Sequence, residues 1–155
     1  MPDSNRRLAS LRRDLQRAGG LDVRTWLDLF HATVELAIAR VRLRSRHVRD
    51  LLGSSETAYR PSSQILERSL VELVERVAFA IPRAGRRLPW RADCLVQALA
   101  AQRWLERQGI YTQLIVGVPK PIPSDFEAHA WLKVGGRVVT GGDISGYVPL
   151  IGDQA

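Results

Sequence analysis

The apolar residues of this 155-residue chain change their spacing once, at Gly109. Before Gly109 they recur every three or four positions, which is the period of an amphipathic helix, and after it they recur at every second position, as in a strand. Helices followed by closely connected strands are typical of an α+β fold with a small antiparallel sheet. A chain of this length forms about one domain with one modest core.

Two long helices are predicted in the first half of the chain. The first covers residues 22–49, after a cap at Asp22, and its apolar residues form one stripe: Trp26, Phe30, Val34, Ala37, Ile38, Val41 and Val48. The second begins at Ser62 or Ser63 and runs to about Ala80, because Pro82 is expected to stop it. Its core face comprises Leu66, Leu70, Leu73, Val74 and Val77.

A third helix is predicted after Asp93, a good N-cap residue, with Gly109 placed for a left-handed C-terminal cap. Strands are expected at residues 110–118, 128–134 and 137–140, the last two joined by a Gly135-Gly136 hairpin turn. Beyond Gly141-Gly142 the chain is expected to be irregular. We divide the sequence into an Arg-rich helical segment, residues 1–60, and a core unit, residues 61–155.

The positive charge of the chain, +7 in total, is concentrated in residues 1–60, which hold 12 arginines and 7 acidic residues. Such a patch could attract nucleic acid, an anionic membrane or an acidic polypeptide, and a solvated helix face is the alternative. The segment lacks interleaved aromatic residues and any nucleic-acid-binding motif, so we expect no nucleic-acid partner. No apolar run has the length of about 18 to 20 residues that a membrane span needs.

The chain has a single cysteine, which excludes an internal disulfide and a multi-cysteine zinc site. Its first residues contain arginines without an apolar stretch, so they do not resemble a secretory signal. Both observations favour a cytoplasmic protein.

Cys94 follows the predicted N-cap Asp93, so its thiol lies in the first turn of the third helix. Unpaired N–H groups and the helix dipole favour a thiolate there, whereas the Asp93 carboxylate opposes it. A nucleophilic role therefore requires a histidine, and the alternative is a small buried cysteine that fills a gap in the core.

His129 is the best partner for Cys94, because it lies on a predicted strand between Ala128 and Ala130, which would let another element approach. The 35 residues that separate it from Cys94 are enough for one helix, one strand and one loop. His129 can therefore act as general base and then as general acid. His31 and His47 stand among arginines, where a surface position is the better interpretation.

An acid should orient the imidazole of His129, and Asp143, just after Gly141-Gly142, is the first one past the hairpin. A solvent-facing Asp143 in a turn is the alternative, and Asp125 and Glu127 compete for the role. Glu127 is two residues from His129 and should share its face of the strand. Cys94, His129 and Asp143 thus form a candidate papain-like triad.

The sequence resembles the transglutaminase-like core of lasso peptide maturation B proteins between about Trp90 and Leu150. Four motifs and the late segment 147–150 carry the resemblance: Asp93-Cys94-Leu95-Val96-Gln97-Ala98-Leu99, Leu105-Glu106-Arg107-Gln108-Gly109-Ile110, Leu114-Ile115-Val116-Gly117-Val118 and Ala128-His129-Ala130-Trp131-Leu132. In that family the acid usually comes about two positions before Asp143, where Thr140-Gly141 stand here.

The resemblance implies a leader peptidase that cuts a ribosomally made precursor with no metal or organic cofactor. It also implies two partners, a separate leader-binding protein and an ATP-dependent cyclase that closes the macrolactam. The N-terminal helices and the loop Arg83–Arg91 are the expected docking surfaces. The competing interpretations are a transamidase or amidase with the same catalytic residues, and a non-catalytic helical binding module with a structural Cys94.

Overall fold

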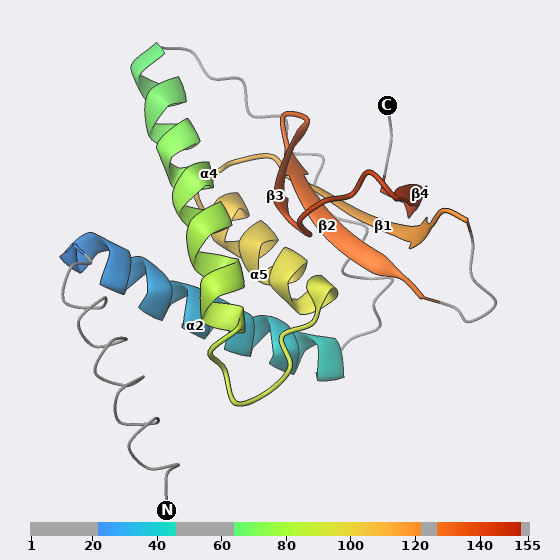
Figure 1. Cartoon of the computed structure of the whole chain (residues 1–155). Helices are drawn as coiled ribbons and strands as arrows, with labels where there is room; N and C mark the ends of the chain where they lie inside the picture. Colours follow the sequence, from blue (N-terminus) through green and yellow to red (C-terminus); the bar gives the residue numbers. More distant parts are fainter. Residues whose placement is uncertain (1–21, 46–63, 122–126, 153–155) are drawn as a thin grey trace, which may run out of the picture.

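The structure is a computed structural model that describes residues 22–45, 64–121 and 127–152. In these residues three helices precede a four-stranded antiparallel sheet, which confirms the α+β prediction (Figure 1). The elements are α2 (Val23–Ser45), α4 (Gln64–Gly85), α5 (Cys94–Glu106), β1 (Gln113–Pro119), β2 (His129–Val134), β3 (Arg137–Thr140) and β4 (Tyr147–Ile151). None of the described helices has the length and apolarity that crossing a bilayer requires.

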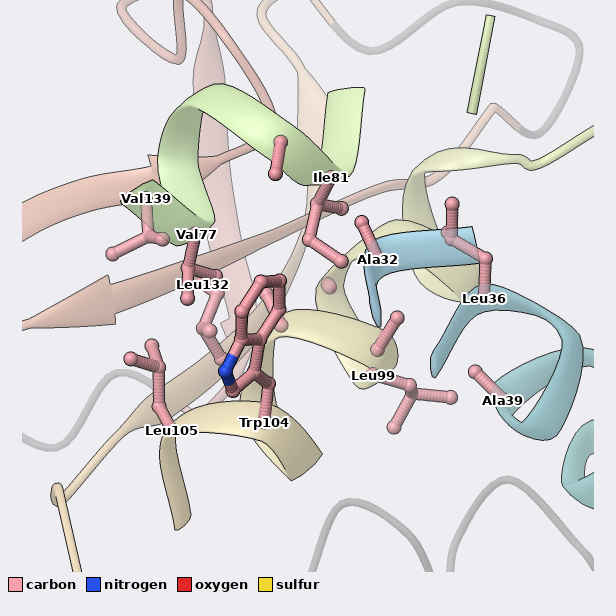
Figure 2. Packing of buried hydrophobic residues seen from close by; sticks show 14 of the residues in the cluster. Ala32, Leu36, Ala39, Val77, Ile81, Leu99, Trp104, Leu105, Leu132 and Val139 are labelled. Carbon is pink, nitrogen blue, oxygen red and sulfur yellow. The ribbon is translucent and has the colours of Figure 1, made fainter. Parts of the chain in front are cut away.

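The helices form two layers over the sheet. Helix α5 packs against β1, β2 and β3, and α4 packs against α5 and β3. Helix α2 packs against both α4 and α5. Apolar side chains of all three helices and of the sheet meet in one core, which places Trp104 and Leu99 of α5 between Leu36 of α2 and Leu132 of β2 (Figure 2).

Helix α2 does not bury the predicted apolar stripe. Its buried apolar face is formed by Leu29, Ala32, Leu36 and Ala39. Trp26, Phe30 and Val41 are 48%, 70% and 63% exposed. The helix has apolar residues on two faces, and the face with two alanines is the one that lets α4 and α5 approach closely. Val48 lies outside the described residues.

Two buried carboxylates tie α2 to the other helices. Asp28 accepts two hydrogen bonds from the Arg76 guanidinium of α4. Glu35, only 1% exposed, accepts a hydrogen bond of 2.8 Å from Arg103 of α5 and lies 3.3 Å from the His31 ring. Removing the arginine of either pair would destabilise the fold, because a buried carboxylate would lose one of its partners. These pairs therefore help to hold α2 in its position against α4 and α5.

Pro82 does not stop α4, contrary to the prediction. The helix continues through Pro82 to Gly85. Proline within a helix removes one backbone hydrogen bond, which normally ends or kinks it. Here Ile81 and Ala84 on either side of Pro82 are buried in the core, and the burial of the last turn offsets the lost bond. Val74 and Val77 lie in the core as predicted, whereas Leu70 and Leu73 are half-buried.

The sheet has the order β3-β2-β1-β4. The predicted strands at 128–134 and 137–140 match β2 and β3, whereas β1 begins at Gln113 instead of Ile110. The tail that was expected to be irregular contains β4, which pairs antiparallel with β1 at the edge of the sheet opposite β3. Because β4 pairs with β1, Tyr147 at the start of β4 lies at the same end of the sheet as His129 at the start of β2.

The predicted boundary at residue 60 falls in the segment 46–63, which lies outside the described residues. The division into two units remains a prediction. Helix α2 nevertheless shares one hydrophobic core with α4, α5 and the sheet.

Candidate active site

Cys94 and His129 line the same cavity, which has a volume of about 530 Å³. Cys94 comes from the first turn of α5, and His129 comes from the first residue of β2. Helix α5 also contributes Gln97, and α4, the turn that follows it, β3 and the glycines after β3 supply the rest of the wall: Ala78, Pro82, Arg86, Val138, Val139, Thr140, Gly141 and Gly142. The fold thus brings the two predicted reactive side chains to one concave site.

The N-terminus of α5 surrounds Cys94 with backbone donors. The first hydrogen bond of the helix runs from the Gln97 N–H to the Asp93 carbonyl at 3.0 Å. The N–H groups of residues 94–96 therefore have no carbonyl partner within the helix. Such groups can bind a developing negative charge on a substrate oxygen.

Asp93 occupies the predicted N-cap position, but its carboxylate makes no capping hydrogen bond. It lies instead 3.4 Å from the Nε atom of Arg91, and both side chains are exposed. The Gln97 amide donates a hydrogen bond of 2.7 Å to the Ala92 carbonyl, which fixes the chain that enters the helix.

The imidazole of His129 is oriented by a backbone group. Its Nε2 atom lies 2.7 Å from the carbonyl oxygen of Gly141, which follows β3. A carbonyl oxygen only accepts hydrogen bonds, so Nε2 carries the proton of this contact. In the neutral ring Nδ1 is then the basic nitrogen, which is the state that a general base requires.

Two aromatic rings surround His129. Tyr147 of β4 lies against the imidazole with a centroid separation of 4.7 Å and an interplanar angle of 32°. The Trp131 ring lies 6.1 Å away. These contacts restrict rotation of the imidazole, and β4, which sequence patterning missed, supplies one of them.

Gly141 can reach the imidazole because it has no side chain. Its φ angle is +108°, and a Cβ atom at this position would lie 2.4 Å from the Cβ atom of Trp131. The backbone therefore packs directly on Trp131.

We expect Gly141→Ala to lower the free energy of unfolding by about 2–6 kcal/mol, because left-handed strain and overpacking each cost about 1–3 kcal/mol. Gly142→Ala is the matched control: its φ angle is also positive, +69°, but a Cβ atom there meets no atom within 4 Å. Urea unfolding of both variants checks this difference. Equal losses would show that the contact with Trp131 does not constrain the backbone.

Among the described residues Asp143 forms no hydrogen bond or ion pair with His129. Its Oδ1 atom accepts a hydrogen bond of 3.0 Å from the Ser145 N–H. This bond, with a second one from the Ser145 side chain, holds the pKa of the exposed Asp143 carboxyl below its ordinary value. Asp143 is therefore ionised at neutral pH and stabilises its own turn. The role of Asp143 in orienting His129 remains a prediction.

The other candidates lie elsewhere. Glu127 is exposed in the two residues before β2. His31 is not a simple surface residue, because it contacts Glu35 and lies against the Trp104 ring at 4.2 Å. Asp125 and His47 lie outside the described residues. In the described part of the chain, no three or more His, Cys, Asp and Glu side chains could together hold a metal ion.

Several residues of the cavity were not predicted from the sequence. Gln97 could have been recognised, since it stands three positions after Cys94 on the same helix face. Arg86 belongs to the loop Arg83–Arg91, which was expected only as a docking surface. Thr140 has no such signal, because it reaches the cavity through the packing of β3. Tyr147 has none either, because it packs on His129 from β4. Thr140 is 2% exposed, and its hydroxyl has no hydrogen-bond partner among the described residues.

A comparison with protein families identifies one match. The model of the transglutaminase-like superfamily matches residues 30–151, from the first half of α2 to the end of β4. No curated protein and no solved structure matches the sequence.

Proposed function

The chain belongs to the transglutaminase-like superfamily, and on this basis we propose that it is a cysteine peptidase that removes the leader from a lasso peptide precursor. The superfamily typically contains cysteine-based enzymes, and its domain fits a cysteine protease or a transamidase. The observation that supports peptide-bond chemistry best is the shared cavity of Cys94 and His129, in which Gly141 holds the imidazole with Nδ1 as the basic nitrogen.

The proposed reaction is acyl transfer. Nδ1 of His129 takes the thiol proton as the Cys94 sulfur attacks the carbonyl carbon of the scissile peptide bond. The N–H groups at the start of α5 stabilise the oxyanion. The imidazolium then protonates the leaving amine, which departs with the C-terminal product. Water, deprotonated by Nδ1, hydrolyses the thioester and releases the leader. These steps require no metal or organic cofactor.

The lasso peptide context rests on the sequence motifs around Cys94 and His129. We propose that a separate leader-binding protein delivers the precursor and that an ATP-dependent cyclase uses the freed amine. A transamidase would share every step up to the thioester, and only the acceptor would differ.

The proposal is tested by incubating the purified chain with the precursor peptide encoded beside its gene. The reaction is run with and without the neighbouring leader-binding protein and with and without glycine ethyl ester as an added amine. Intact masses distinguish hydrolysis at one bond from transfer of the leader to the amine. Cleavage at one bond supports the peptidase. An amine adduct as the main product would favour the transamidase, and no reaction from folded protein with all partners would favour a binding module.

Asp143→Ala is expected to lower the cleavage rate by only about 2–10-fold, because the variant loses the Ser145 hydrogen bond but keeps the Gly141 carbonyl on His129. Steady-state kinetics of the Asp143→Ala and Asp143→Asn variants measure this effect. A loss as large as that caused by removing His129 would restore Asp143 as the orienting acid. Rescue by Asn would indicate that the turn, and not the charge, is required.

A further inference from the structure

Helix α2 carries exposed apolar side chains that do not line the cavity of Cys94 and His129, and we call them the exposed stripe of α2. It begins near the N-terminus of the helix, where Val23, Trp26, Leu27 and Phe30 are between 48% and 72% exposed. Scattered apolar residues are common on protein surfaces, but a contiguous patch usually marks a binding surface.

A cavity of about 290 Å³ opens beside this stripe. Trp26, Leu29 and Phe30 of α2 form one wall, and Ala84, Arg87 and Leu88 at the end of α4 form the other. This volume is at the lower end of the range of about 300–1,000 Å³ for small-ligand sites, and it is large enough for one or two apolar side chains of a polypeptide.

Two adjacent arginines connect this cavity with the site around Cys94. Arg87 lines the apolar cavity, and Arg86 lines the cavity that contains Cys94 and His129. Both side chains are exposed, and neither guanidinium forms an ion pair or hydrogen bond with the described residues. Arg76, Arg103 and Arg137 each pair with a carboxylate. The segment between the two cavities therefore carries positive charge that the described residues do not neutralise.

Three occupants of the stripe can be compared by their charge: residues 1–21 of the same chain, a second copy of the chain, and a separate acidic peptide. Residues 1–21 of the same chain contain five arginines and two acidic residues, and a second copy carries a net charge of +7. Arg86 and Arg87 would repel both. An acidic peptide with apolar side chains complements both the cavity and the arginines.

We propose that the peptide substrate binds this surface, with an apolar side chain in the α2 cavity and an acidic side chain on Arg87. The inference rests on the proposed peptidase function, and it adds a second contact region for the segment of substrate that leads to Cys94. Binding at a distance from the reacting bond lets the enzyme select acidic, apolar substrates without altering the residues that perform the chemistry.

Binding is measured apart from cleavage, on full-length Cys94→Ala protein. The probes are three fluorescein-labelled peptides: an acidic peptide of alternating Glu and Leu with one Phe, the same peptide with Lys in place of Glu, and the same peptide with Ala in place of Leu and Phe. Fluorescence anisotropy at two salt concentrations gives the affinities. We expect only the first peptide to bind, and to bind more weakly at high salt.

Arg87→Glu is expected to weaken binding at least about tenfold, and Phe30→Ala to weaken it several-fold, because both side chains line the cavity. Both residues are exposed, so the fold should be retained. The matched controls are Arg42→Glu, which makes the same charge change at an exposed position of α2, and Val41→Ala, about 16 Å along the helix from Phe30. Neither control should change the affinity.

Three results would overturn the proposal: no binding of the acidic peptide, equal binding of the Lys peptide, or equal losses in Arg87→Glu and Arg42→Glu. A dimer in sedimentation experiments that Phe30→Ala dissociates would assign the surface to a second copy instead. If the precursor is cleaved, Arg87→Glu should raise KM and leave kcat unchanged. Binding of the acidic peptide without cleavage of any precursor would contradict the peptidase function while the surface itself is retained.

Discussion

Replacing Cys94 with alanine is expected to reduce precursor cleavage by at least about 10³-fold, because no other thiol in the chain can form the acyl-enzyme. Cys94 is half-buried and packs beside the core, where an alanine fits without a clash. The midpoint temperature of thermal unfolding should therefore remain close to that of the parent protein. Intact-mass kinetics with matched protein concentrations measure the loss.

The single cysteine also provides a direct control. Iodoacetamide should modify the parent protein once, at Cys94, and should block cleavage in proportion to the modified fraction. Cleavage that continues in the fully alkylated protein or in the Cys94→Ala variant would exclude a thiol nucleophile. The site around His129 would then have to act through a different group.

His129→Ala is expected to cause a loss of similar size, because the variant lacks both the base for the thiol and the acid for the leaving amine. At pH 6 a free cysteine is almost fully protonated, so Cys94 of this variant should react with iodoacetamide more slowly than Cys94 of the parent protein. The rate of iodoacetamide modification from pH 5 to pH 9 measures this effect.

Tyr147→Leu serves as the control for the packing around the imidazole, because it removes the ring that lies on His129 and keeps both reactive groups. It should retain more activity than His129→Ala. Equal alkylation rates of parent protein and His129→Ala at pH 6, neither faster than a free cysteine, would indicate a structural Cys94.

The order of elements could be predicted from the sequence because helix and strand periods depend on local residues alone. The face that α2 buries could not, since two apolar faces compete and the choice depends on how closely α4 and α5 approach Ala32 and Ala39. Strand β4 was missed because its five residues contain Pro149, which weakens a strand pattern, yet an edge strand tolerates proline. Its pairing with β1 joins segments that are distant in the sequence, and local residue spacing does not reveal such a contact.

The two reactive side chains of the candidate site were predictable because their residue types restrict the chemistry and their spacing fits the intervening elements. The structure places both on one cavity, although their catalytic roles remain predictions. The hydrogen bond that the imidazole makes in the structure was not predictable. The Gly141 carbonyl is a backbone group, and its position depends on a φ angle of +108° after β3. The sequence favours an acidic side chain for this role because acids commonly orient a catalytic imidazole, and the assignment of Asp143 to it remains a prediction.

We expect the ion pair between Glu35 and Arg103 to influence the position of Cys94, because Arg103 and Cys94 belong to the same helix. Arg103 and Cys94 stand nine residues apart on one rigid helix, so a tilt of about 4° at Arg103 would move Cys94 by about 1 Å over about 13.5 Å. A displacement of about 1 Å between reacting groups can cost about 10²-fold in rate. We therefore expect α2 to influence the position of the thiol, although none of its residues lines the cavity of Cys94 and His129.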